Sequence, residues 1–292
     1  MVYAILREQL GNQLFIWAAG FSLARRWNVP LRLITSNYGR TGTYMSLRSF
    51  PIKAEFLSPW PGLISKMLLK REFYTLQSFA NRVGDWEEAV EGDFAQCAFH
   101  RLKQASANKT LLDGMFQSWR YFFEDAESIR GELGVTSNLM SRYCDKDTLK
   151  RIRSGCSVSL HVRRTDYLNG GVNGKFSVCS KNYFLRCMDY CRQNLQEPVF
   201  FVFSDDIAWA KSELSAADVR FISSENYRFR NIEDFVLMSN CRHHIIPNST
   251  YSWWAAFAGE QSGLVLGPTK WFNDDSAVIA DKLLLGWKQV AV

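Results

Sequence analysis

Two adjacent arginines follow an alternating, β-branched run in the segment SVSLHVRRTDY, which covers residues 157–167. The run predicts a buried strand over 157–162, with His161, Arg163 and Arg164 at its carboxyl end. Ligands of open α/β sheets bind outside the carboxyl ends of strands. Because the planar fork of arginine fits phosphate oxygens, the pair predicts a ligand with several anionic oxygens. The alternative is that both arginines pair with carboxylates at the surface.

Two further predicted strands of the second half end in polar residues. The strand over 198–203 leads into Asp205 and Asp206, whose carboxylates can accept hydrogen bonds from a base or a ribose. The strand over 243–246 leads into a helix start that contains Asn248, Ser249, Thr250 and Ser252. A helix start favours an anion, although plain capping is the alternative for these residues. Since parallel strands share one carboxyl edge, the three loops together predict a site for a nucleotide with a pyrophosphate.

The elements that would position these residues alternate between strand and helix. In the second half we expect strands over 157–162, 198–203, 219–222, 243–246 and 263–266, and helices over 181–195, 207–214, 232–241 and 250–259. Ser204 or Asp205 is the expected N-cap of the helix that starts at residue 207. The short loops between these elements predict a doubly wound α/β domain.

The first half opens with the same pattern. We expect a strand over 2–6, a turn over 7–13, a helix over 14–27, strands over 29–34 and 110–116, and a helix over 127–133 stopped by Gly134. Gly11 permits the tight turn, so Asn12 and Gln13 stand at a helix start facing a cleft between domains; alternatively, Asn12 caps the helix. A length of 292 residues suggests two domains, which we place at 1–150 and 151–292.

Composition excludes several classes of protein. The formal charge is +6 with no block of five like charges, so a nucleic-acid partner is not expected. The apolar run over residues 1–6 is too short for a signal peptide, and no uncharged stretch is long enough to span a bilayer. The seven cysteines are an odd number in a long chain, which argues against a disulfide framework. We therefore expect a cytoplasmic enzyme.

Nucleotide and metal signatures of the common kinds are missing from the sequence. There is no P-loop motif, and no dinucleotide-binding glycine motif follows a strand. Asp145 and Asp147 have the spacing of a metal-binding DxD pair, but they are explained more simply as the start of a helix. Cys187 and Cys191 fall one helical turn apart without a histidine nearby. We expect no metal site.

Four segments in order resemble the motifs of the α-1,2-fucosyltransferases, glycosyltransferase family 11. They are Leu10–Phe15, His161–Tyr167, Phe203–Asp206 and Asn248–Trp254, and Gly114–Ser118 is similar to a further segment of the family. The HxRRxD pattern also resembles the α-1,6-fucosyltransferases and the protein O-fucosyltransferases. One loop departs from the family, because Arg7, Glu8 and Gln9 stand where glycines usually precede Leu-Gly-Asn-Gln.

The resemblance implies a GT-B-like α/β fold, with two Rossmann-like domains facing a cleft, and inverting transfer from GDP-L-fucose without a metal or other cofactor. The C-terminal domain would bind the donor, with Arg163 on the β-phosphate and Arg164 in support. The other donor contacts would come from His161 and from Asp205 or Asp206 at the nucleoside, and from Asn248, Ser249, Thr250 and Ser252 around the pyrophosphate.

The remaining roles follow from the same resemblance. Asn12 and Gln13 would meet the donor or the acceptor. Asp166 is the candidate general base, although it could equally orient Arg163 or the loop. The expected acceptor is a galactose of a surface polysaccharide such as O-antigen, or of a lipid-linked glycan reached from the periphery of the inner membrane. The alternatives are a fucosyltransferase of α-1,6 or α-1,3 linkage and a non-catalytic GDP- or glycan-binding protein.

Overall fold

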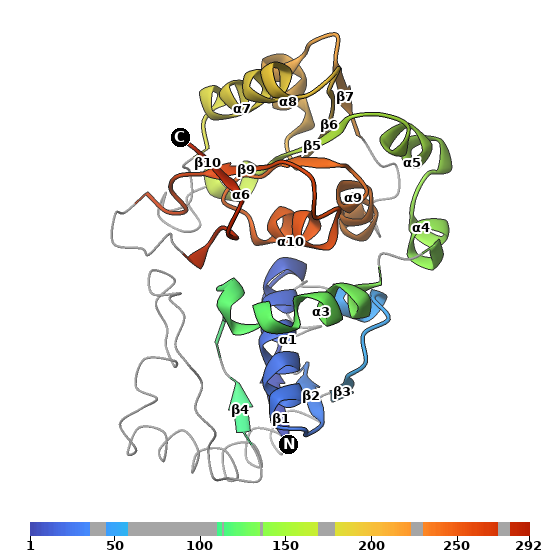
Figure 1. The fold of residues 1–292 in the computed structure, drawn as a ribbon, viewed down its shortest axis with the longest axis vertical. Coiled ribbons are helices and arrows are strands. Elements are labelled where there is room, and N and C mark those ends of the chain that lie inside the picture. Colours follow the sequence, from blue (N-terminus) through green and yellow to red (C-terminus); the bar gives the residue numbers. More distant parts are fainter. Residues whose placement is uncertain are drawn as a thin grey trace. The chain divides into compact units, whose positions relative to one another are not determined.

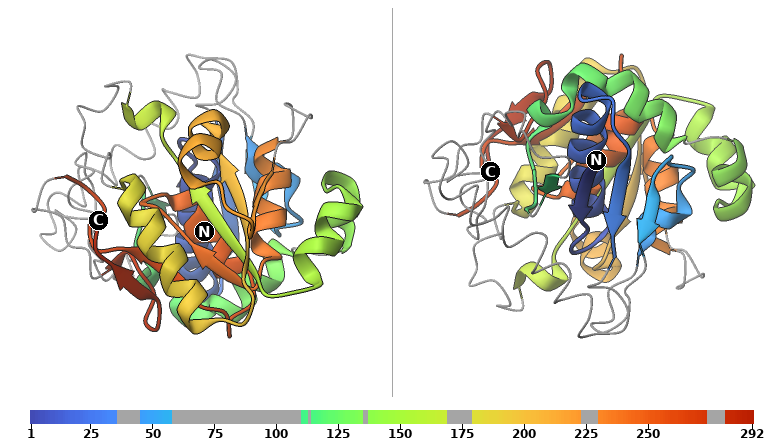
Figure 2. Two further views of the ribbon diagram at one scale, coloured as in Figure 1. Left: turned by 90° about the horizontal axis from the view of Figure 1, so that it is seen from above. Right: turned by 90° about the horizontal axis from the view of Figure 1, so that it is seen from below.

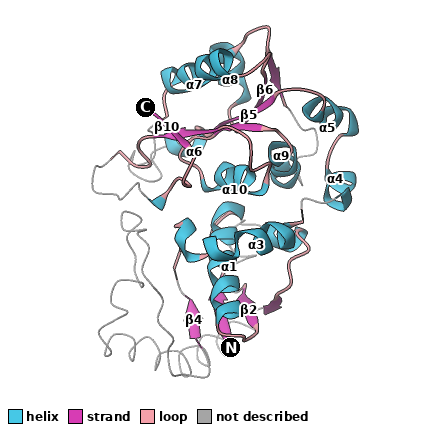
Figure 3. Cartoon of the chain, in the orientation of Figure 1, coloured by secondary structure: helices cyan, strands magenta, loops and turns pink. Residues whose placement is uncertain are grey.

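The computed structural model of the chain describes residues 1–35, 45–57, 110–112, 114–134, 137–168, 179–222, 230–273 and 281–292. Contacts divide the chain into two compact units, unit 1 (Met1–Glu132) and unit 2 (Leu133–Val292). Each unit has a parallel sheet accompanied by helices, which is the predicted α/β architecture (Figures 1 and 3). None of the described helices is both long enough and apolar enough to cross a membrane.

Unit 1 contains a four-stranded parallel sheet in the order β3-β2-β1-β4. Its strands are β1 (Val2–Ile5), β2 (Leu31–Ile34), β3 (Glu55–Leu57) and β4 (Thr110–Leu112). Its described helices are α1 (Leu10–Arg26) and α3 (Ala126–Leu133), with short 3-10 turns η1 (Ser46–Ser49), η3 (Trp119–Tyr121) and η4 (Phe123–Asp125). Gly134 follows α3 with a left-handed φ of 46°, which confirms the predicted stop.

Helix α1 begins earlier than predicted, at Leu10, so Gly11 lies in its first turn and not in the turn before it. Glu8 makes that turn instead, with a left-handed φ of 57°, and Gln9 is the N-cap. The expected start at residue 14 was wrong because apolar residues surround α1 on nearly every side and leave a weak helical period. Asn28, with φ 51°, ends the helix in the left-handed conformation common there.

Unit 2 contains a six-stranded parallel sheet in the order β10-β9-β8-β5-β6-β7. Its strands are β5 (Ser157–Val162), β6 (Val199–Ser204), β7 (Val219–Phe221), β8 (His243–Ile245), β9 (Val265–Pro268) and β10 (Lys288–Val290). The first of them, β5, lies inside the sheet, and the chain winds outward to β7 on one side and to β10 on the other. This arrangement confirms the predicted doubly wound domain.

The last strands of unit 2 differ from the expectation. β5 has the predicted bounds, whereas the strand expected over 263–266 is β9, which begins at Val265. A further strand, β10, pairs with β9 at the edge of the sheet and was not predicted. It is three residues long with two exposed positions, so it lacks the apolar alternation that reveals a strand.

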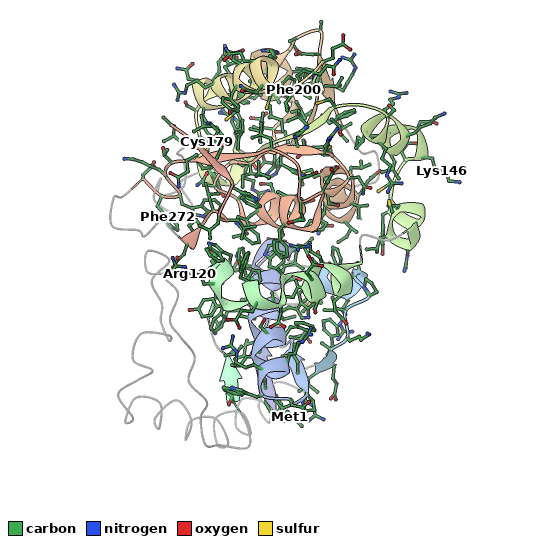
Figure 4. The ribbon with its side chains drawn as sticks, viewed as in Figure 1. Met1, Arg120, Lys146, Cys179, Phe200 and Phe272 are labelled. Atoms are coloured by element: carbon green, nitrogen blue, oxygen red, sulfur yellow. The ribbon has the colours of Figure 1, made fainter. Side chains whose placement is uncertain are left out.

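Helices cover both faces of this sheet. The described helices of unit 2 are α4 (Ser137–Tyr143), α5 (Lys146–Arg153), α6 (Thr165–Leu168), α7 (Lys181–Asn194), α8 (Ile207–Leu214), α9 (Arg230–Ser239) and α10 (Thr250–Ala258). Figure 1 shows α7 and α8 on one face and α9 and α10 on the other. Side chains of α7, α8 and the central strands form one core, in which Phe200 is fully buried (Figure 4).

The boundary between the units falls earlier than the predicted one after residue 150. The cause is the pair of helices α4 and α5, which precede the sheet of unit 2 but belong to it. α4 packs against α9, and the Arg153 guanidinium donates to Asn240 Oδ1 at 2.7 Å. In Figures 1 and 2, α4 and α5 lie beside α9 at one side of the sheet. The sequence between the two units has no composition typical of a linker, so the position of the boundary could not be predicted from it.

Candidate functional site

The carboxyl ends of three neighbouring strands bring the predicted loops of unit 2 to one edge of the sheet. β5 pairs with β6 on one side and with β8 on the other, both in parallel. The chain leaves β5 toward β6 and later returns to β8 on the opposite side. The edge between β5 and β8 is therefore a topological switch point, the place where open α/β sheets bind ligands. The predicted meeting of three loops is confirmed.

Both arginines at this edge pair with a carboxylate, as the alternative interpretation of the sequence predicted. Arg163 Nε lies 3.5 Å from Asp205 Oδ2, and 36% of the Arg163 side chain stays exposed. Arg164 Nε lies 3.4 Å from Asp206 Oδ2, and its guanidinium carbon lies 3.9 Å from the centre of the Trp209 ring. A cation over an aromatic face is stabilised by about 0.5–2 kcal/mol. Arg164 is thus held against α8, while Arg163 presents more of its surface to solvent.

Asp206, and not Ser204 or Asp205, is the N-cap of α8. Its Oδ1 accepts a hydrogen bond from Trp209 N at 3.1 Å, whereas Ser204 Oγ accepts one from Asp206 N at 2.9 Å. Asp205 accepts hydrogen bonds from the loop after β5. The predicted cap was wrong because three successive residues here all favour capping and the sequence does not separate them. Both carboxylates therefore have hydrogen-bond partners within the chain itself.

His161 occupies a buried position near the carboxyl end of β5. Burial lowers the pKa of its imidazole to about 3, and the positive charge of Arg163 adds to this effect against the opposing charge of Asp205. Within the described residues its buried Nδ1 has no hydrogen-bond partner, and its ring centre lies 5.5 Å from that of Tyr251. An unpaired buried polar atom is costly, so Nδ1 is an atom for which a bound ligand or water would be a partner.

Two buried histidines of this sheet predict a loss of stability in weak acid. Burial lowers the pKa of His161 and of His244 to about 3, from 6.5. Between pH 6.5 and about pH 3 the unfolded chain binds more protons than the folded chain. The free energy of unfolding is therefore highest above pH 6.5, where both states are neutral, and it decreases as the pH falls. We expect each histidine to add a slope of about 1.4 kcal/mol per pH unit.

Denaturant unfolding at about pH 7 and about pH 5.5 measures this slope, at a pH where most carboxylates stay ionised. His244→Asn removes one of the two groups, and its side chain can still reach the Ser159 hydroxyl that lies 2.8 Å from His244 Nδ1. The variant should lose less stability than the wild type over the interval. Equal losses in the two proteins would contradict the assigned role of His244.

The loop after β8 presents the start of α10 at the same edge. Ser249 is the N-cap and is buried, and its side chain makes no capping hydrogen bond. The Asn248 carbonyl accepts a hydrogen bond from Tyr167 Oη at 3.0 Å, which ties the loops after β5 and β8 together. Thr250 and Ser252 lie in the first turn. The first N–H groups of a helix have no partner inside it, so they favour an anion here.

Asp166, the candidate base, belongs to the short helix α6, but its side chain lies outside the described part of the structure. Its neighbours are described and both bond to other loops of the edge. Thr165 Oγ1 donates to Asp205 Oδ2 at 2.7 Å, and Tyr167 donates to Asn248. The role of Asp166 stays a prediction.

The side chains of Asn12 and Gln13 have different partners in unit 1. Gln13 is fully buried; its Nε2 donates to Glu8 O at 2.8 Å and its Oε1 accepts from Leu47 N at 3.0 Å. It therefore holds the turn around the left-handed Glu8. Asn12 is not the cap of α1, and its Oδ1 accepts from Gln117 Nε2 at 2.8 Å. Because Gln117 follows β4, which pairs with β1, the two amides join the carboxyl ends of adjacent strands.

Three side chains of these edges were given no role from the sequence, although Tyr251 and Gln117 lie within segments that resemble the family. Trp209 supports Arg164, Tyr251 lies beside His161, and Gln117 pairs with Asn12. Trp209 had a local signal, because it stands three residues after the cap Asp206, where the cap hydrogen bond ends. The other two contacts join residues that are about 90 and 105 positions apart, and only the folded chain shows them.

The residues that could have suggested a metal are used otherwise. Asp145 caps α5, with Oδ2 accepting from Thr148 N at 2.7 Å. Burial raises the pKa of Cys187 and of Cys191 to about 12, so both are thiols near neutral pH. In the described ranges no three histidine, cysteine or acidic side chains are grouped so that they could hold a metal ion.

Comparison with known proteins adds a family and a fold. A family model described as Glycosyl transferase family 11 matches residues 1–291. An alpha-1,2-colitosyltransferase from Escherichia coli is 27% identical over 305 residues, which cover 99% of each chain. A galactoside alpha-(1,2)-fucosyltransferase 1 from Leontocebus fuscicollis is 32% identical over 156 residues, which cover 50% of this chain and 42% of that one.

Among solved structures, the crystal structure of NodZ alpha-1,6-fucosyltransferase soaked with GDP-fucose is similar. Its TM-score is 0.56 at 15% sequence identity, and the match covers 88% of this chain and 92% of NodZ. At this identity the likeness bears on the fold alone. It confirms the predicted α/β, GT-B-like fold.

Proposed function

The chain belongs to glycosyltransferase family 11, and we propose that it transfers L-fucose from GDP-L-fucose to a galactose hydroxyl of a glycan, forming an α-1,2 linkage. The observation that carries this proposal is the switch point of unit 2. There a half-exposed arginine, a buried neutral histidine and the start of α10 meet at one edge of the sheet. These groups suit a diphosphate attached to a nucleoside.

The chemistry of the transfer fits these groups. The bond between the fucose anomeric carbon and a β-phosphate oxygen breaks, the acceptor oxygen bonds to that carbon from the opposite face, and the acceptor hydroxyl loses its proton. Negative charge grows on the leaving diphosphate. Arg163 and the N–H groups of α10 are fixed before this charge appears, so they can stabilise it without reorganisation and without a metal. We keep Asp166 as the candidate for receiving the proton.

The names of the relatives support the acceptor and the linkage. One is a galactoside alpha-(1,2)-fucosyltransferase, and the other forms an alpha-1,2 linkage by its name. For sugar hydroxyls on unit 1 we propose Asn12, together with Gln117. Gln13 has a supporting role, because both ends of its amide bond within the protein.

A second candidate function is transfer of colitose in place of fucose. The observation that favours it is the colitosyltransferase, which matches 99% of this chain. The α-1,6 linkage in the name of NodZ keeps a different linkage as a further alternative.

The direct test is an acceptor screen in the presence of EDTA. The protein is mixed with GDP-fucose or GDP-colitose and with a panel of β-galactosides, and GDP release and product are followed. We expect a fucosylated galactoside, with the new linkage at the 2-hydroxyl by NMR. A product made only from the colitose donor would replace the fucose assignment. Absence of transfer from both donors, together with tight GDP binding, would favour a non-catalytic binding protein.

A further inference from the structure

Asp205 lies directly after β6 at the edge of the sheet where Arg163 emerges, and most of its side chain is buried. Within the described part of the chain, its hydrogen bonds and its ion pair go to the three residues that follow β5. Oδ1 accepts from Arg164 N at 2.9 Å. Oδ2 accepts from Thr165 N at 3.2 Å and from Thr165 Oγ1 at 2.7 Å, and it lies 3.5 Å from Arg163 Nε. One carboxylate thus joins two neighbouring loops.

Most of the acceptor capacity of Asp205 is used within the chain. An ionised carboxylate offers about four acceptor positions, and three of them accept hydrogen bonds from Arg164 and Thr165. The contact with Arg163 is an ion pair to the same carboxylate. Hydrogen bonds to a charged acceptor are the strong ones, so these contacts hold Asp205 toward the loop after β5.

The neighbouring arginine is held by separate groups. Asp206 and Trp209 hold the Arg164 side chain against α8, and Asp205 contacts only the backbone N–H of Arg164. Among these residues, the Asp205 carboxylate is therefore directed to the Arg163 side chain and to the turn from which that side chain extends. A free arginine side chain has many rotamers, and a fixed one loses less freedom when it binds an anion.

We propose that Asp205 is a positioning residue, which fixes the turn after β5 and orients the Arg163 guanidinium toward the donor diphosphate before the donor binds. The inference rests on the proposed donor site and deepens it. It replaces the contact of Asp205 with guanine or ribose that the family resemblance implied.

The test measures the affinity of the Asp205→Asn variant for two ligands. The side chain of asparagine has nearly the same shape, but it loses the charge facing Arg163 and turns an amide N–H toward a backbone N–H. Isothermal titration calorimetry gives the affinities for GDP and for inorganic pyrophosphate. If Asp205 positions Arg163, both affinities fall by a similar factor of about ten, the scale of one hydrogen bond to a charged group. If Asp205 contacts the nucleoside, only the GDP affinity falls, and that result would overturn the proposal.

Two sets of variants serve as controls. Asp218→Asn alters another carboxylate of unit 2 that pairs with an arginine, Arg192, at 2.8 and 2.9 Å. Asp218 directly precedes β7, at the opposite edge of the sheet, so both affinities should be unchanged. Thr165→Val removes the hydroxyl that donates a hydrogen bond to Asp205. We expect it to lower the affinities for GDP and for pyrophosphate by one common factor. Thr165→Ser restores the hydroxyl and should restore both affinities.

Hydrogen exchange gives a readout that needs no ligand. The amide protons of Arg164 and Thr165 should be protected in the wild type and should exchange faster in Asp205→Asn, while the sheet amides stay protected. Unchanged exchange at both positions would overturn the inference. A wild type that binds pyrophosphate but not GDP would refute the proposed donor, and the role of Asp205 would still be decided by pyrophosphate.

Discussion

Replacing Arg163 with alanine should lower transfer from GDP-fucose by at least about thirtyfold, which corresponds to about 2 kcal/mol of transition-state stabilisation. The guanidinium lies at the switch point beside the carboxylate of Asp205, where charge develops as the diphosphate leaves. Alanine removes both the charge and the planar fork. The measurement is kcat/KM with GDP-fucose and the galactoside selected by the acceptor screen.

Two variants separate the role of Arg163 from a general loss of charge. Arg163→Lys keeps the charge without the fork, and we expect activity between those of the wild type and the alanine variant. Arg192→Ala is the matched control, because Arg192 is also half-buried and ion-paired in unit 2, to Asp189 and Asp218. It should retain near-normal kcat/KM. If Arg163→Ala behaved like the Arg192 control, the phosphate role of Arg163 would be refuted.

Gly263→Ala should destabilise unit 2 by about 3 kcal/mol or more, the upper range for overpacking. A Cβ at this position would stand 1.7 Å from the Arg242 carbonyl oxygen and 3.0 Å from its carbon. Arg242 directly precedes β8 and Gly263 lies just before β9. The backbone itself must therefore move where two neighbouring strands begin. Denaturant unfolding followed by tryptophan fluorescence measures the change.

Gly155→Ala is the control for the glycine prediction, since a Cβ there would have no atom within 4 Å. An alanine that fits the native backbone stabilises by about 0.4–1 kcal/mol, because it restricts the unfolded chain. Gly263 lies at the amino ends of the strands, opposite the site. The folded fraction of Gly263→Ala should thus bind GDP as the wild type does. Stability equal to that of the control would show that the close approach to Arg242 is wrong.

The second sheet and its edge could be predicted because their signals are local. β5 alternates valine and leucine with serine and histidine, is buried along its length and ends abruptly in charged residues, so its bounds were right. β6 leads into two aspartates and β8 into the polar start of a helix, and parallel strands place such ends at one edge of the sheet. The polar ends of three strands were therefore sufficient to locate the candidate site.

Features set by distant contacts could not be predicted. The cap of α8 was assigned to Ser204 or Asp205, and this was wrong. Asp205 accepts a hydrogen bond from the loop after β5, which leaves Asp206 as the cap, and this choice depends on a contact distant in sequence. The unit boundary depends on the packing of α4 against α9. The burial of Gln13 depends on Leu47, which lies in another part of the chain. In each case tertiary structure selects among local alternatives that have similar energies.

A crystal structure of the protein soaked with GDP tests the central claim most directly, because it needs neither an acceptor nor turnover. We expect the diphosphate outside the carboxyl ends of β5 and β8, with a β-phosphate oxygen about 3 Å from the Arg163 guanidinium. The first N–H groups of α10 should lie beside it. GDP bound away from this edge, with Arg163 remote from its phosphates, would contradict the account.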